Sequence, residues 1–279
     1  MFPNINKFKN DNYNFLNAIT SSTVTASSAA SLITGLNLFE HQIHAYNDYY
    51  LSPGLVSLST SAPTIGQKML EKNIITDGIF AFGRWAPQYG FSRGFNNYQT
   101  VNSGAIQNFP WLEFNLKSIQ NTINNSSVFM MHHPGGHPPY LTKVNNQYQD
   151  IEYSAYIENL RYIDTFFGVL IKYLKDKMIY DDSLIIFIAD HGRSLSGEFS
   201  RKKYQFTEER LRVPCIIKNP NWNEKSQIDL EKYISTQSFI YNSVCDFMDV
   251  NNSERLAAER EIDGITWTCE TIDYTTNDT

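Results

Sequence analysis

Two neighbouring residues, Asp190 and His191, carry side chains that commonly bind divalent cations. They follow the apolar run 184–189 and precede Gly192. Adjacent residues of a strand point to opposite faces, so both can reach one ion only if the chain leaves strand geometry, which Gly192 makes sterically easy. The alternative is a capping aspartate beside a surface histidine, and the three residues alone favour that alternative.

Half of the six histidines lie in one short segment. His132, His133 and His137 follow the apolar run 128–131, in a loop that also holds three prolines. Imidazoles in such a loop can bind a metal, donate to an anionic substrate or act as a general acid. A polar surface loop stiffened by proline is the alternative, but the clustering favours a functional role.

Hydroxyl and basic residues offer further chemistry. Thr25 opens a run of small residues that ends at Gly35, which predicts a helix with its N-terminus at Thr25. Free amides at that end favour an oxyanion, and a metal or base can activate the hydroxyl, although an ordinary N-cap threonine is common. Ser27 and Ser28 are rival hydroxyls. The basic run 201–203 can contact a phosphate or sulfate oxygen, but such runs are usually only solvated.

The elements that must position these residues alternate along the chain. Short apolar or β-branched runs alternate with helical periodicity, which predicts an α/β sheet covered by helices. The run before Asp190 has the continuous apolar character of a central parallel strand, and α/β sheets place ligands at the carboxyl ends of such strands. We also expect strands at 74–82, 128–131 and 213–217, and helices at 63–72, 156–174 and 238–248.

Composition excludes several classes of protein. The chain has 279 residues, of which 42% are hydrophobic and 19% charged, so disorder is excluded as the main state. A net charge of -6 without a basic track argues against nucleic-acid binding. Cys215, Cys245 and Cys269 are too few and too irregularly spaced for a disulfide framework or a cysteine-based zinc site. No apolar run has the length of a bilayer span and no signal peptide is evident, so we expect a soluble chain of undetermined compartment.

Read in order, the motifs resemble the sulfatase family of the alkaline phosphatase superfamily, from about Pro3 to Trp267. The most specific match is at residues 183–192, which are similar to the family's T-L-I-I-F-T-S-D-H-G strand. Residues 25–35 lie at its C-x-P-S-R-x-S-L-L-T-G signature, and residues 137–140 resemble its H-x-P-Y loop. Weaker matches are residues 2–8 with 15–18 at the opening "TPNLDRLA…F.NAY", 82–85 at "G.KW", 90–95 at "GFDRGFD", Lys203 ahead of "LYE…RVP", and 263–265 at "DG.S".

The resemblance implies a site as well as a fold. It implies a divalent metal held partly by Asp190 and His191, with Thr25 as nucleophile and further metal ligand. Calcium is the metal that the family favours, and magnesium, manganese or zinc are alternatives. The resemblance further implies that His137 and Lys203 act in catalysis and contact the substrate. We also expect the Ser28 hydroxyl to bind substrate.

The implied fold is an alkaline-phosphatase-like α/β/α sandwich with a largely parallel central sheet. We expect residues 1–219 to form the catalytic domain and residues 220–279 the C-terminal part of the same domain with a tail. The family's first strand, which ends in metal-binding carboxylates, lies ahead of the matched segment, so the domain is N-terminally incomplete. We therefore expect weak metal binding, and an unpaired sheet edge that favours oligomerisation.

Threonine at position 25 departs from the sulfatase pattern, because it cannot form the formylglycine that sulfatases make from cysteine or serine. Ser27 and Ala29 also replace the proline and arginine of the signature. Threonine is instead the nucleophile type of related phosphodiesterases and phosphoethanolamine or phosphoglycerol transferases. The sequence thus predicts a metal-dependent hydrolase of sulfate or phosphate esters, acting on a small-molecule, glycan or lipid substrate. The alternatives are a transferase using Thr25 and a catalytically inactive remnant.

Overall fold

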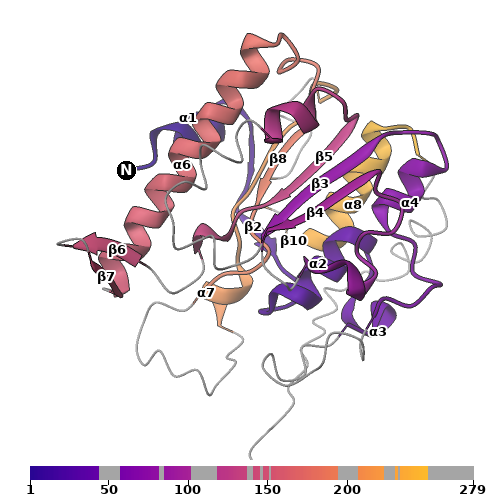
Figure 1. The fold of residues 1–279 in the computed structure, drawn as a ribbon, viewed down its shortest axis with the longest axis horizontal. Coiled ribbons are helices and arrows are strands. Elements are labelled where there is room, and N and C mark those ends of the chain that lie inside the picture. The colour runs from indigo at the N-terminus through magenta and orange to yellow at the C-terminus, as the bar shows by residue number, and fades with distance from the viewer. Residues whose placement is uncertain are drawn as a thin grey trace, which may run out of the picture.

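The computed structural model describes residues 1–43, 57–81, 85–101, 118–136, 141–144, 147–150, 152–193, 207–222, 230–231 and 233–250. They form an α/β fold in which helices cover both sides of the strands, with α6 on one side and α2, α4 and α8 on the other (Figure 1). The helices are α1 (Pro3–Asp11), α2 (Thr25–Thr34), α3 (Leu38–His41), α4 (Ile65–Leu70), α6 (Glu152–Asp176), α7 (Glu208–Leu211) and α8 (Thr236–Phe247).

The strands form two three-stranded sheets and two pairs. Their bounds are β1 (Tyr13–Phe15), β2 (Asn17–Ile19), β3 (Thr76–Ala81), β4 (Asn97–Val101), β5 (Val128–His132), β6 (Leu141–Val144), β7 (Gln147–Asp150), β8 (Ile185–Ile188), β9 (Cys215–Lys218) and β10 (Tyr233–Ser235). In the sheet β4-β3-β5 all strands are parallel, whereas β9 runs antiparallel to both β1 and β8. β2 pairs with β10 in parallel, and β6 with β7 antiparallel. The predicted α/β class is confirmed, and the parallel arrangement holds for the β3 sheet.

Helix α2 begins at Thr25, as its small residues predict. All its positions from Ala26 to Thr34 are buried, because alanine and serine let the helix approach its neighbours closely. It ends where Gly35 adopts a left-handed conformation with φ of 64° and donates its N–H to the Ser31 carbonyl. Thr25 is thereby held at the N-terminus of a rigid element.

The boundaries of α4 and β3 differ from expectation by a few residues. Pro63 lies outside α4, because Thr64 caps the helix in a reciprocal capping box with Gln67. The strand expected at 74–82 is β3, and its six residues are all buried. β9 begins after Pro214, as the proline predicts.

Helix α1 is fixed to the molecule through its N-terminus. Asp164 of α6, which is 2% exposed, accepts hydrogen bonds from the backbone N–H groups of Asn4 (3.3 Å) and Ile5 (2.8 Å) and from Asn4 Nδ2 (2.9 Å). A carboxylate there satisfies free amides and interacts favourably with the helix dipole. A distant residue thus performs the capping that Phe2, at the N-cap position, does not.

The core has apolar layers on both sides of the strands. On the α6 side, Phe166 packs with Ile79 and Ile119, and the next residue, Phe167, packs with Phe8 and Ile216. On the opposite side, α8 contributes consecutive residues to two further clusters, Ile240 beside β9 and Tyr241 beside α4. Within the described residues, no helix combines the length and apolar character needed to cross a bilayer.

Candidate active site

The chain leaves strand geometry directly after β8. The Asp190 carbonyl accepts hydrogen bonds from Thr20 Oγ1 (2.5 Å) and Ser28 Oγ (2.6 Å), and the Gly192 N–H donates to the Arg210 carbonyl (2.8 Å). A Cβ on Gly192 would lie 2.0 Å from the Glu209 carbonyl oxygen, so only glycine fits this approach. The turn brings two successive side chains, Asp190 and His191, to one side.

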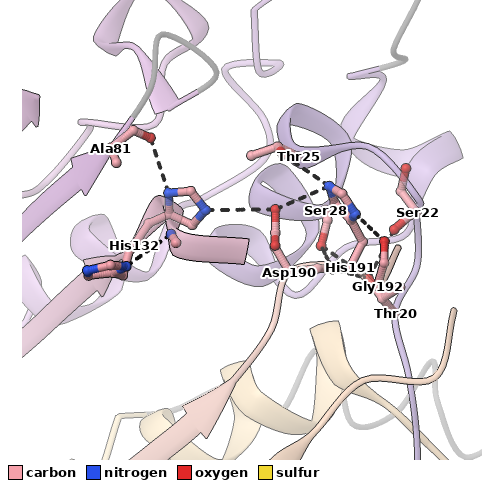
Figure 2. A network of polar contacts seen from close by, with 11 residues as sticks. Thr20, Ser22, Thr25, Ser28, Ala81, His132, Asp190, His191 and Gly192 are labelled. Atoms are coloured by element: carbon pink, nitrogen blue, oxygen red, sulfur yellow. Dashed lines mark hydrogen bonds and ion pairs between the residues drawn. The ribbon is translucent and has the colours of Figure 1, made fainter. Parts of the chain in front are cut away.

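Both side chains then face Thr25 (Figure 2). Thr25 Oγ1 lies 3.2 Å from His191 Nε2, and the same nitrogen lies 3.6 Å from Asp190 Oδ2. The side chains of Asp190 and His191 are 17% and 22% exposed, so the cluster is shielded but reachable from solvent. A hydroxyl, an imidazole and a carboxylate therefore converge at the N-terminus of α2.

Hydrogen bonding fixes the tautomer of His191. Its Nδ1 lies 2.8 Å from the Gly192 carbonyl oxygen, which can only accept, so Nδ1 carries the proton. When the ring is neutral, it presents a lone pair at Nε2 toward Thr25, whose hydroxyl donates to it. That lone pair can either take the Thr25 proton or bind a metal. The two roles exclude each other at any one moment.

Asp190 is the negative group of the cluster. Burial, the largest influence, raises the pKa of its carboxyl, but His191, His132, the His191 N–H and the Thr25 hydroxyl together outweigh burial and hold the pKa below its usual value. The carboxylate is therefore charged at neutral pH. It stabilises a cation beside it, whether an imidazolium or a metal ion.

His132 joins this cluster from the end of β5. Its Nδ1 lies 3.1 Å from the Ala81 carbonyl oxygen, so Nδ1 carries a proton, and its Nε2 lies 3.9 Å from Asp190 Oδ2. The indole of Trp85 lies against the ring, with centroids 5.3 Å apart. The sequence marked His132 as one of three candidate histidines but could not show that it faces Asp190, because that requires knowing which strand ends meet.

His133 turns to the other face, away from this cluster. It packs against Tyr162 and Phe166 of α6, with ring centroids 5.8 and 5.2 Å apart. Burial, and secondarily the neighbouring His132, lower the pKa of His133 to about 3, so its ring is neutral. Among the three histidines of the loop, His133 has a packing role, and His137 lies outside the described residues.

The structure brings together three of the predicted site residues, Thr25, Asp190 and His191. Ser28 lies beside them and is 1% exposed, but its hydroxyl bonds the Asp190 carbonyl and contacts Thr20, 3.1 Å away. Its contact with substrate stays a prediction. Lys203, like His137, lies outside the described residues. Thr20 was not predicted, since nothing in its sequence context marks a hydroxyl that anchors a strand end.

The donor set suits a divalent metal only in part. Asp190 and His191 offer one carboxylate and one imidazole lone pair, and the Thr25 hydroxyl is a third donor within reach. In the part of the chain that the structure describes, no group of three or more His, Cys, Asp or Glu residues is arranged to hold a metal ion. The described residues alone thus do not complete a metal site.

Comparisons with known proteins bear on the family and the fold. A choline-sulfatase of Rhizobium meliloti (strain 1021) is 39% identical over 66 residues, which are 24% of this chain and 13% of that protein's length. The structure of Ps i-CgsB in complex with k-i-k-neocarrahexaose superposes with a TM-score of 0.69 at 18% identity, covering 92% of this chain and 68% of the other. The phosphonate monoester hydrolase SpPMH from Silicibacter pomeroyi gives 0.66 at 15% identity, covering 90% and 69%.

A third structure, the lipoteichoic acid synthase LtaP from Listeria monocytogenes, gives a TM-score of 0.63 at 16% identity and covers 90% of this chain and 67% of the other. At such low identities these likenesses show the fold alone. The sequence profile of the sulfatase family, in contrast, matches residues 1–250. By that match, and by the resemblance that its motifs carry, the chain belongs to the sulfatase family.

Proposed function

We propose that this chain carries the catalytic site of a metal-dependent hydrolase that cleaves sulfate or phosphate esters, with Thr25 as nucleophile. The observation that carries the proposal is the 3.2 Å approach of Thr25 Oγ1 to the Nε2 lone pair of His191. A nucleophile hydrogen-bonded to a base of fixed tautomer is the usual arrangement for activating a hydroxyl. The position at the N-terminus of α2 adds free amides that favour the oxygens of an anionic ester.

The described residues account for the first half of the reaction. Thr25 Oγ1 forms a bond to the sulfur or phosphorus atom while the bond to the ester oxygen breaks. In the metal-free site the hydroxyl proton passes to His191 Nε2, and the Asp190 carboxylate, 3.6 Å away, stabilises the resulting imidazolium. The leaving oxygen needs a proton, and we propose His137 as its donor. Water then hydrolyses the Thr25 ester.

Asp190 and His191, with Thr25 as third ligand, would hold a divalent ion, which when bound would supply positive charge to the ester oxygens and would replace His191 in activating the Thr25 hydroxyl, because Nε2 is then a ligand and not a base. Calcium, magnesium, manganese and zinc are the candidates. We propose that Lys203 and Ser28 contact the substrate anion. We also propose one catalytic domain over residues 1–219, continued by residues 220–279, which the pairing of β10 with β2 and the packing of α8 beside α2 support.

Threonine at position 25 favours phosphate esters over sulfate esters as substrates. The reason is that threonine cannot form the aldehyde that sulfatases make from cysteine or serine. The second candidate function is transfer of a phosphate-bearing headgroup through a phosphothreonine at Thr25. Two structural neighbours are called a phosphonate monoester hydrolase and a lipoteichoic acid synthase, and a curated relative is called a choline-sulfatase. Both hydrolysis and transfer begin with the same attack by Thr25.

The test compares the wild-type chain with Thr25→Ala and Thr25→Ser on aryl phosphates and aryl sulfates, with each of the four metals and with chelator. We expect Thr25→Ala to lose about 10³-fold or more in kcat/KM, while Thr25→Ser keeps a nucleophilic hydroxyl and retains measurable turnover. Turnover by Thr25→Ala equal to wild type would refute the proposal. A stable adduct on Thr25, mapped by mass spectrometry after incubation with a headgroup donor, would favour transfer over hydrolysis.

A further inference from the structure

Thr20 lies one residue beyond β2 and contacts the candidate active site through the backbone of Asp190. Its hydroxyl donates to the Asp190 carbonyl at 2.5 Å, and Thr20 is 3% exposed (Figure 2). The two residues are 170 positions apart in the chain, and β2 and β8 belong to different sheets. Thr20 therefore links the segment that leads into α2 with the strand end that carries Asp190 and His191.

The backbone of Thr20 is held by the same segment that holds Gly192. The Thr20 N–H donates to the Leu211 carbonyl at 2.9 Å, and the Gly192 N–H donates to the Arg210 carbonyl at 2.8 Å. Two adjacent carbonyls at the end of α7 thus fix both residues, and the hydrogen bond from the Thr20 hydroxyl to Asp190 closes a ring of contacts. The ring fixes the Thr20 hydroxyl relative to the end of β8.

One peptide unit joins Asp190 to His191, and it is held at both edges. At its carbonyl, Ser28 Oγ donates at 2.6 Å beside Thr20, so both lone pairs of the oxygen are used. At its N–H, hydrogen bonding from His191 helps to lower the pKa of the Asp190 carboxyl. Because the peptide unit is planar, the direction of the carbonyl also fixes the position of the His191 Cα. The Thr20 hydroxyl thus acts on both site residues.

The Thr20 hydroxyl has one proton and three neighbouring acceptors. Besides the Asp190 carbonyl, they are the Ser22 carbonyl at 3.2 Å and Ser28 Oγ at 3.1 Å. The contact with the Asp190 carbonyl is the shortest, at 2.5 Å, so the proton points there. Without the Thr20 hydroxyl, this carbonyl keeps one hydroxyl donor in place of two among the described contacts, and the peptide unit can rotate about the remaining hydrogen bond.

We propose that Thr20 is a positioning residue: through the Asp190 carbonyl, its hydroxyl sets the backbone orientation in which Asp190 and His191 both face Thr25. The inference rests on the proposed function, in which Thr25 is the nucleophile. Thr25 Oγ1 lies 3.2 Å from His191 Nε2, and rotation of the peptide unit would change this distance. A displacement of about 1 Å at a reacting group can lower the rate about 10²-fold.

The test removes the hydroxyl at nearly constant shape. Thr20→Val lacks it, Thr20→Ser retains it, and Thr20→Ala lacks it without a second methyl beside the carbonyl, so the result does not depend on whether Thr20→Val folds. Thr34→Val is the matched control. The Thr34 hydroxyl is also buried and donates to a carbonyl, that of Ala30 at 2.6 Å, but at the end of α2 opposite Thr25. The control therefore loses a similar hydrogen bond without a change at Asp190.

Nuclear Overhauser effects between the Thr25 side chain and the His191 ring report the positioning without any need for turnover. We expect them to weaken in Thr20→Val and Thr20→Ala, and to keep their wild-type intensity in Thr20→Ser and Thr34→Val. Wild-type intensity in both variants that lack the Thr20 hydroxyl would overturn the proposal. An equal loss in Thr34→Val would also overturn it, because the effect would then reflect general destabilisation.

Steady-state kinetics of the same variants measure the effect on the reaction. We expect kcat/KM of Thr20→Val to fall about 30-fold, through kcat and not KM, with recovery in Thr20→Ser and a change below about twofold in Thr34→Val. Equal losses in Thr20→Val and Thr20→Ser would overturn the positioning role, because the second variant keeps the hydroxyl. An inactive wild-type chain would refute the proposed hydrolase, and the nuclear Overhauser effects would still decide the role of Thr20.

Discussion

Two successive side chains point to the same side beyond β8 but to opposite sides at the end of β5. After β8, Asp190 and His191 both turn toward Thr25, and their facing atoms lie 3.6 Å apart. At the end of β5, His132 turns toward Asp190, whereas His133 packs into α6 against Phe166. One strand end therefore gathers two functional side chains on one side, and the other separates them.

The backbone explains the difference. His132 is still part of the ladder, in register with Phe80 of β3, so it and the next residue alternate between faces. Beyond β8, the Asp190 carbonyl is held by two hydroxyls and the Gly192 N–H by the Arg210 carbonyl. Two adjacent side chains can serve one site only where such contacts take the chain out of strand geometry.

The largest effect should come from charge at the β8 end. Asp190→Asn removes the carboxylate that stabilises a cation at the site, so we expect kcat/KM to fall about 10³-fold, equivalent to about 4 kcal/mol in transition-state stabilisation. His132→Gln, on the β5 side of the same carboxylate, should cost less than about tenfold, since its contact with Oδ2 is 3.9 Å. Steady-state kinetics and metal analysis of both dialysed variants check this. Equal losses would mean that the two strand ends contribute alike.

The next effect concerns the turn itself. Gly192→Ala would place a Cβ 2.0 Å from the Glu209 carbonyl oxygen, a backbone atom that cannot move aside easily. We expect the free energy of unfolding to fall by about 3 kcal/mol. Gly136→Ala is the matched control near the β5 end, because a Cβ there meets nothing within 4 Å. Urea denaturation of both variants measures the difference, and a stable Gly192→Ala variant would show that the turn is not needed.

The last effect is a pH dependence at the β5 end. The pKa of His133 is about 3 in the folded chain, below the ordinary histidine value, so the unfolded chain binds the extra proton first. The contribution of His133 to the free energy of unfolding is therefore fully present above about pH 6.5. It decreases as the pH falls toward 3, by up to about 1.4 kcal/mol per pH unit. His133→Phe keeps an aromatic ring against Phe166 and should reduce this slope. An unchanged slope in denaturation from pH 7 to 4 would contradict the assignment.

Local patterns in the sequence predicted much of this site. The small residues after Thr25, the apolar run before Asp190 and the glycine after His191 placed the helix, the strand and the turn correctly. The family motifs predicted the fold class, which the structure confirms. What the sequence could not predict depends on contacts between distant segments. The meeting of β5 with β8, the hydroxyls that anchor Asp190, and the diverging histidines all require the register of strands that are far apart in the chain.

The antiparallel order of β9 was missed for the same reason. Its apolar residues fit either direction, and only its position between β1 and β8 decides it. Direction is a property of the assembled sheet, so no local pattern in 213–217 predicts it.

The pairing of β1 with β9 also has a consequence during synthesis. Tyr13 lies opposite Ile217, so the first strand waits for a partner that the ribosome makes about 200 residues later, roughly 10 to 40 s at ordinary rates of translation. Helix α1 likewise lacks the carboxylate that accepts its N-terminal hydrogen bonds until Asp164 has been synthesised. The segment of α1 and β1 therefore stays accessible to chaperones and proteases while the intervening residues are translated, and the emergence of β9 determines when β1 can pair.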